Sequence, residues 1–228
     1  MKTIVAIHQP NFFPWLGYFD KIRQADVFVF LDDVSYPRSG SGGMGSWSNR
    51  VKIAVNGEPR WITCPVRRMP LGTAIRLAEI DDSQAWRVKF IRTLEANYRR
   101  ERGFASAMDL LEPLVRSGSP QLSEFNIAVV QAIAAHLGVK ATFVRQSELE
   151  VSGHATELLI SIVKAVGGTT YLYGGGAAGY QDDALIERSG LELRAQSFAP
   201  VAYGPPETFI PGLSVIDYLM RDGRKLGA

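Results

Sequence analysis

One stretch near the start of the chain limits its possible folds more than any other. Residues 4–7 are apolar and mostly β-branched, a polar turn with two prolines follows, and apolar residues then recur at helical spacing up to Ile22. This pattern predicts a strand, a rigid turn and a helix. The outer face of this helix is expected to carry the charged residues Asp20, Lys21 and Arg23. The first strand of an open α/β sheet is central, and ligands bind beyond the carboxyl ends of such strands. We therefore expect His8, Gln9 and Asn11 to lie at a ligand site, with a purely structural His8 as the alternative.

Later runs of strand length predict the rest of a mostly parallel sheet. They cover residues 27–31, 139–144, 169–173 and 191–195. Helical patterns stand between strands, which is typical of a Rossmann-like α/β fold with three layers, in which helices cover both faces of the sheet. An Asn-Gly pair within residues 51–64 predicts a β-hairpin excursion from this fold. Alternating apolar residues predict a half-exposed strand at 75–80.

The composition indicates the class of protein. The chain has 228 residues, of which 46% are hydrophobic and 21% charged, and this fits one globular α/β domain over residues 1–228. The 25 basic and 23 acidic residues nearly balance, so no nucleic-acid partner is expected. No apolar run reaches the roughly 20 residues of a membrane span, and no signal-peptide pattern is present. We expect a cytoplasmic protein without a membrane span.

The cysteine and histidine residues exclude several kinds of site. The single Cys64 excludes an internal disulfide and a cysteine-based zinc site. The three histidines lack the spacing of a ligand pair, so no metal site is predicted. The sequence contains no dinucleotide, P-loop or catalytic-triad fingerprint. The cofactor is therefore unknown from the sequence.

Two further groups of polar residues extend the predicted site. Asp32 and Asp33 end the second predicted strand, at the same sheet edge as His8, where they could bind a metal, an amine or a ribose; capping of the following loop is the alternative. Asn49 and Arg50 begin the predicted hairpin. A guanidinium binds phosphate or carboxylate groups through two hydrogen bonds, so Arg50 is a candidate anion clamp, and a surface ion pair is the alternative.

Two later segments add candidate binding residues. His154 precedes a predicted helix at 158–166, whose free backbone donors favour an anion; an exposed His154 beside a simple cap is the alternative. Gly174, Gly175 and Gly176 follow a predicted strand and lead to Tyr180, and glycines there permit close approach of a ligand to the backbone. Residues 39–46 are rich in glycine and serine and predict a mobile loop, either a lid or an insertion.

Several motifs together resemble one protein family. They read HQPNFFPWLGYFDKI, ADVFVFLDDVSY, WSNRVKI, WITCPV, TTYLYGGGAAGYQDD and LSVIDYLMRDG, in this order over nearly the whole chain. They are similar to motifs of the WbqC-like family, bacterial proteins met in gene clusters for O-antigen and other surface or secreted glycans. The resemblance implies sugar or polysaccharide tailoring, as in lipopolysaccharide biosynthesis, without naming a reaction.

Two classes of function fit these observations. The first is a transferase that moves an acyl or aminoacyl group onto an amino sugar, either free or nucleotide-linked. In this class His8 is a general base or a phosphate contact, Asp32 or Asp33 orients the amine, and Arg50 holds an anion. The second is a non-catalytic protein that binds a sugar or a partner in glycan assembly. The turn at His8 also partly resembles the histidine turn of nucleotidylyltransferases, with Tyr18 at the position of their second histidine. We expect a small-molecule partner (a sugar, nucleotide sugar or amino acid), and the sequence leaves a homodimer open.

Overall fold

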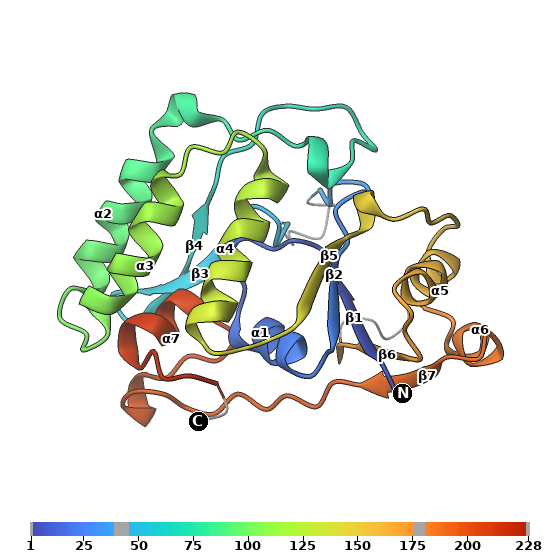
Figure 1. Ribbon diagram of the computed structural model, residues 1–228. Helices are drawn as coiled ribbons and strands as arrows, with labels where there is room; N and C mark the ends of the chain where they lie inside the picture. The colour runs from blue at the N-terminus through green and yellow to red at the C-terminus, as the bar shows by residue number, and fades with distance from the viewer. Residues whose placement is uncertain (1, 39–45, 176–180, 227–228) are drawn as a thin grey trace. The chain divides into compact units, whose positions relative to one another are not determined.

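The strand predicted at residues 4–7 is the central strand of a parallel sheet. The computed structural model describes residues 2–38, 46–175 and 181–226 (Figure 1). It contains a five-stranded sheet in the order β5-β2-β1-β6-β7, in which all neighbouring strands run parallel. The strands are β1 (Ile4–His8), β2 (Val27–Phe30), β5 (Thr142–Arg145), β6 (Thr170–Tyr173) and β7 (Glu192–Ala195). The predicted mostly parallel sheet is confirmed, and the strand order reverses at β1 and β6.

The chain forms two compact units. Unit 1 contains the parallel sheet and comprises Met1–Gln9, Gly17–Asp33 and Val139–Ala199. Unit 2 comprises Pro10–Leu16, Val34–Gly138 and Pro200–Ala228. The boundary between them falls inside the stretch that carries His8, because the strand belongs to unit 1 and the proline turn to unit 2. A single domain over residues 1–228 stays a prediction.

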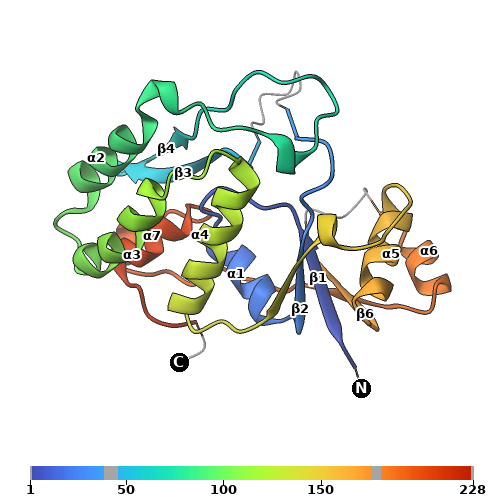
Figure 2. The ribbon, with the colours of Figure 1, turned by 45° about the horizontal axis from the view of Figure 1, so that its top comes forward.

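Helices cover both faces of the sheet of unit 1, as expected. On one face, β1, β2 and β6 bury Val5, Ile7, Val29 and Tyr171 in a cluster with the helices α5 (Thr156–Ala165) and α6 (Asp183–Arg188). The other face carries aromatic residues, and Tyr18 of α1 (Leu16–Arg23) packs on Phe28 with ring centroids 5.4 Å apart. Figure 2 shows α5 and α6 on one side of β1 and α1 on the other. The three-layer α/β fold is therefore confirmed.

Unit 2 contains the predicted hairpin and four α-helices. Strands β3 (Arg50–Val55) and β4 (Glu58–Thr63) pair antiparallel around Asn56 and Gly57, whose φ angles of 52° and 79° are those that a tight two-residue hairpin turn requires. The helices are α2 (Trp86–Tyr98), α3 (Phe104–Arg116), α4 (Leu122–His136) and α7 (Val215–Arg221). The hairpin prediction is confirmed. Among the described residues, no helix is long and apolar enough to span a bilayer.

The proline turn is held in the core of unit 2. The Phe12 and Phe13 rings are fully buried, and both lie within 6.0 Å of the Phe90 and Phe125 rings. Phe13 has a φ of 40°, which is unfavourable for a side chain of this size, and burial of its ring offsets that strain. Asn126 donates hydrogen bonds from Nδ2 to the Pro10 carbonyl at 2.9 Å and to the Ser48 carbonyl at 2.7 Å. Packing and hydrogen bonds thus fix the turn that follows β1.

One predicted strand was wrong. Residues 75–80 begin with a 3-10 helix, Ile75–Leu77, and join neighbouring segments only through isolated bridges. Ile75, Ala78 and Ile80 are buried whereas Leu77 is exposed, so the strict alternation of a half-exposed strand fails at the 3-10 helix. Residues 39–45 of the predicted mobile loop lie outside the described residues.

Candidate functional site

His8 is the last residue of the central strand and is partly buried. Its backbone carbonyl accepts a hydrogen bond from the Leu31 amide at 2.8 Å, which joins the ends of β1 and β2. The imidazole Nδ1 lies 3.1 Å from the Gln9 carbonyl oxygen, and the Tyr18 ring packs edge-on with its centroid 4.7 Å away. Because a carbonyl oxygen only accepts, Nδ1 carries the proton in this contact. The other ring nitrogen, Nε2, is then unprotonated and can accept a proton.

The surroundings of His8 keep its imidazole neutral. Burial and, to a smaller extent, the Lys21 charge together lower the pKa of His8 from 6.5 to about 4, although the hydrogen bond to Gln9 acts in the opposite direction. The Gln9 carbonyl also accepts a hydrogen bond from the Tyr18 hydroxyl at 3.0 Å, which fixes the acceptor that His8 uses. At neutral pH, His8 is therefore an unprotonated base of fixed orientation.

Lys21 is a candidate site residue that the sequence pattern did not indicate. Helical spacing placed Lys21 on the outer face of α1, but it is only 4% exposed, and its Nζ donates a hydrogen bond to the Ile7 carbonyl at 2.9 Å. Burial lowers the pKa of Lys21 to about 8. Strongly perturbed lysines cluster at functional sites because a buried charge is costly. A sequence signal existed: Lys21 follows Tyr18 by three residues, so both lie on the helix face next to the end of β1.

Asp20 precedes Lys21 and is also buried, contrary to the outward position that we expected. Its carboxylate accepts hydrogen bonds from Arg23 at 2.7 Å, Gln24 at 2.6 Å and Gln196 at 2.9 Å. Gln196 comes directly after β7 and also donates to the Gly17 carbonyl at 2.8 Å. Asp20 therefore anchors α1 to the exit of β7.

The two acids after β2 have different surroundings. Asp32 is 2% exposed, and its carboxylate accepts hydrogen bonds from the Ser147 amide at 3.0 Å and the Ser147 hydroxyl at 2.7 Å. These bonds tie the exit of β2 to the segment after β5, as a loop-capping acid does. Asp33 is exposed, and its amide donates to Gln146 Oε1 at 3.3 Å. The geometry favours a structural Asp32, and a catalytic role for either acid stays a prediction.

The glycines after β6 have room around them. A Cβ built on Gly174 would meet only Gln196 Oε1, at 3.6 Å, and one built on Gly175 would meet nothing within 4 Å. Open space at these positions suits a ligand that approaches the backbone. Gly176 and Tyr180 lie outside the described residues.

His154 is exposed and lies just before α5. Its carbonyl accepts a hydrogen bond from the Glu157 amide at 3.1 Å. No side chain caps the helix at its N-cap residue, Ala155. Thr156 instead accepts a hydrogen bond from the Asp182 amide at 2.9 Å. The predicted contact between His154 and an anion stays a prediction.

Three predicted binding residues belong to unit 2. Asn11 is buried in the proline turn. Asn49 donates from Nδ2 to the Cys64 carbonyl at 3.0 Å, and it lines a pocket of about 440 Å³. The Arg50 guanidinium lies 4.5 Å from the centre of the Trp61 ring, a cation-π contact. These residues are ordered by side-chain contacts within unit 2.

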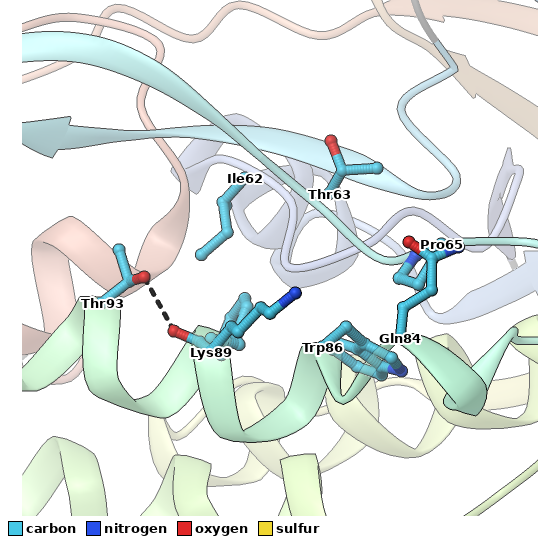
Figure 3. A pocket seen from close by; sticks show the side chains of 8 residues that line it. Ile62, Thr63, Pro65, Gln84, Trp86, Lys89 and Thr93 are labelled. Atoms are coloured by element: carbon cyan, nitrogen blue, oxygen red, sulfur yellow. Dashed lines mark hydrogen bonds between the residues drawn. The ribbon is translucent and has the colours of Figure 1, made fainter.

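A smaller pocket of about 220 Å³ lies between α2 and the segment that includes β4. Figure 3 shows the Lys89 side chain extending from α2 into the space beside Ile62, Thr63 and Pro65. Lys89 is its only cationic lining residue among those described. None of the residues predicted from the sequence lines this pocket.

The structure brings part of the predicted site together. His8 ends β1, and Asp32 and Gly174 follow the ends of β2 and β6; these strands are neighbours in one parallel sheet. Asn11, Asn49 and Arg50 belong to unit 2. Convergence of all the predicted residues in one pocket stays a prediction. No group of three or more potential metal ligands of the His, Cys, Asp and Glu types occurs within the described ranges.

Cys64, the only cysteine, is buried, and burial raises the pKa of its thiol. A raised pKa disfavours the thiolate, which is the nucleophilic form of cysteine. Cys64 therefore packs as a small apolar residue.

The fold and the candidate site define the class of protein: a Rossmann-like α/β protein with a histidine at the end of its central strand. The model of the WbqC-like protein family matches residues 9–227, and the chain belongs to this family. Over 225 residues it is 30% identical to "Uncharacterized protein Rv1507c" of Mycobacterium tuberculosis, and the match covers 96% of this chain and 94% of that protein. No solved structure matches the chain.

Proposed function

We propose that the protein is a transferase that moves an acyl or aminoacyl group onto the amine of a sugar, with His8 as the general base. One observation carries this proposal. The His8 Nδ1 lies 3.1 Å from the Gln9 carbonyl oxygen at the exit of the central strand, which assigns the proton to Nδ1 and leaves the lone pair of Nε2 to act as the base. Sites in open α/β sheets form at this edge, where the strand order reverses.

The proposed reaction has a consistent proton path. The neutral amine attacks the carbonyl carbon of the donor, and Nε2 of His8 takes the proton that the amine loses as the C–N bond forms. The bond from the carbonyl carbon to the leaving group then breaks, and the imidazolium returns its proton to the leaving group. Because Lys21 disfavours the imidazolium, His8 gives the proton up readily.

In this proposal Lys21 also stabilises negative charge on the substrate. Attack on a carbonyl places negative charge on its oxygen, and a nearby cation in a buried site stabilises that charge. Lys21 is largely protonated at neutral pH with a pKa of about 8, and its Nζ is fixed by the Ile7 carbonyl. We infer that it stabilises the negative charge that develops in the transition state.

The sugar is supported by the family resemblance rather than by a contact. The motifs around His8 and Asn49 resemble those of proteins met in gene clusters for O-antigen and other glycans, which implies work on sugars or lipopolysaccharide precursors. The space beside Gly174 and Gly175 is compatible with such a substrate. We propose that the acceptor is an amino sugar linked to a nucleotide.

A non-catalytic sugar-binding protein is the second candidate. Trp47 and Trp61 are 43% and 42% exposed, and their ring centroids lie 5.3 Å apart. Exposed aromatic faces are common in binding surfaces because they bury a large apolar area at low entropic cost. This candidate predicts binding of sugars without turnover.

Ligand screening followed by turnover tests the proposal. A thermal-shift screen against nucleotides, nucleotide sugars and amino acids should show stabilisation by true ligands, because ligand binding favours the folded state by mass action. Pairs of hits are then incubated with the protein, and product formation is followed by mass spectrometry. His8→Gln should abolish turnover, whereas His136→Gln, on α4, should leave it unchanged. Full turnover by His8→Gln would refute the proposed base.

A further inference from the structure

We propose that a pocket lined by three arginines in unit 2 binds the diphosphate group of a nucleotide-type ligand. We call it the arginine pocket; its lining residues are Tyr36, Arg38, Asn49, Val66, Arg67, Arg68 and Met69. The inference goes beyond the proposed transferase, because the pocket lies entirely in unit 2 and would serve a binding protein equally well.

Backbone hydrogen bonds fix the two walls of the arginine pocket. One wall is held by the Tyr36 amide, which donates to the Thr73 carbonyl at 2.8 Å. The other wall is held by the Arg67 amide, which donates to the Glu79 carbonyl at 2.9 Å. Both walls are therefore tied to one segment, residues 73–80. A preformed pocket of this kind loses little entropy when a ligand binds.

The charges of the arginine pocket are not balanced. Arg38 donates hydrogen bonds to the carbonyls of Met69 and Pro70, the latter at 2.9 Å, and neutral acceptors of this kind leave its charge uncompensated. Arg67 pairs with Glu79 at 3.1 Å, and both side chains are exposed, so solvent screens that pair. For Arg68, no hydrogen bond or ion pair is found among the described residues. The pocket thus carries more positive than negative charge.

The other described cavities of unit 2 lack such an excess of arginine charge. The cavity near α7 contains arginines too, but Arg102 and Arg224 pair with Asp222 at 3.0 and 2.7 Å, and Arg221 pairs with Asp217 at 3.2 Å. The pocket in Figure 3 has Lys89 as its cation and half the volume. Of the described cavities, the arginine pocket is the one suited to a ligand with several negative charges.

The size and the chemistry of the pocket point to a diphosphate. Its volume of about 440 Å³ lies in the range of small-molecule sites, and it exceeds what a single inorganic anion needs. Guanidinium groups bind phosphate oxygens through paired hydrogen bonds, and several such groups match the charge of two linked phosphates. Tyr36 and Met69 supply less polar surface for the remainder of the ligand. Burial raises the pKa of Tyr36, and Arg38 and Arg50 are near enough to oppose that rise.

Calorimetric titration with inorganic pyrophosphate, uridine diphosphate and inorganic phosphate tests the proposal. We expect pyrophosphate and uridine diphosphate to bind more tightly than phosphate, with affinities that fall as salt is added. Arg68→Gln should weaken pyrophosphate binding about tenfold, the effect of losing one charge-assisted hydrogen bond. The matched control is Arg92→Gln, an exposed arginine of α2 that does not line the pocket, and it should change affinity by less than about twofold.

Two outcomes would overturn the proposal. One is absence of pyrophosphate binding, or equal affinity for phosphate and pyrophosphate. The other is unchanged pyrophosphate affinity in Arg68→Gln, whose side chain is exposed and whose loss leaves the fold intact. His8→Gln should bind pyrophosphate as the unmodified protein does. Loss of turnover with intact pyrophosphate binding, or the reverse, therefore separates the transferase proposal from this one.

Discussion

Replacing Lys21 with methionine should leave the protein as stable at pH 7, or more stable by up to about 2 kcal/mol. The pKa of Lys21 falls from 10.5 to about 8 because of burial, which corresponds to a cost of about 3.4 kcal/mol for the charged form. The hydrogen bond to the Ile7 carbonyl offsets about 1.5 kcal/mol of that cost. Methionine has a side chain of similar length, and it removes both the cost of the buried charge and the stabilisation by the hydrogen bond. A gain in stability on removal is typical of residues kept for function.

The pH dependence isolates the contribution of Lys21. Its folded pKa lies below its unfolded pKa, so the unfolded state binds more protons between about pH 8 and 10.5. Lys21 should therefore contribute a rise of up to about 3 kcal/mol in the free energy of unfolding across this window. Cys64 and the buried tyrosines, whose pKa values are raised in the folded state, act in the opposite direction, so the rise is measured as the difference between the unmodified protein and Lys21→Met. Urea denaturation followed by tryptophan fluorescence at pH 7 and at about pH 10 measures both quantities.

Lys164→Met is the matched control for this experiment. Lys164 is an exposed lysine of α5 in the same unit, so its replacement should change stability by less than about 0.5 kcal/mol and keep the rise with pH. If Lys21→Met loses more than about 2 kcal/mol at pH 7 and keeps the rise, Lys21 is a structural donor and not a strained site residue.

Three further predictions concern the same elements. The pKa of His8 is about 4 in the folded state and 6.5 in the unfolded state, so the unfolded state binds more protons between these pH values. The contribution of His8 to the free energy of unfolding should therefore fall by up to about 3 kcal/mol as the pH drops from 6.5 to 4. Urea titrations of His8→Gln should lack that contribution. Asn126→Ala removes two buried hydrogen bonds and should lower unfolding free energy by about 2 to 4 kcal/mol in urea; a loss under about 1 kcal/mol would show that the turn is held by packing alone. Asp32→Asn replaces one acceptor that faces Ser147 with a donor, so it should lower stability by about 1 to 3 kcal/mol, and an unchanged melting temperature would argue against this bond.

Much of the parallel sheet could be predicted because its strands are short, apolar and separated by helical patterns. Residues 27–31 were predicted as a strand, and β2 is Val27–Phe30. The strand predicted at 139–144 starts three residues later, as β5, because the ladder begins where the Thr142 amide bonds to the Asp26 carbonyl. Strand ends depend on the partner strand, and a single sequence does not contain that information.

The surroundings of the site residues were harder to predict. Asn126 lies 116 residues from Pro10, and no local pattern shows that it bonds to the turn after β1. Lys21 was assigned to solvent because charged residues are mostly exposed, and a buried charge is the exception that functional sites exploit. His8 was selected as a candidate because strand exits in open α/β sheets are ligand sites, a rule that needs only the order of elements, and its role stays a prediction.

The ionisation state of His8 is the centre of this account, and nitrogen NMR of its imidazole measures it directly. The chain has three histidines, so His136→Gln and His154→Gln assign the His8 signals. At pH 7 we predict the neutral form with the proton on Nδ1 and an unprotonated Nε2, unchanged down to about pH 5 because the pKa of His8 is about 4. An imidazolium at pH 7, or a proton on Nε2, would contradict the account.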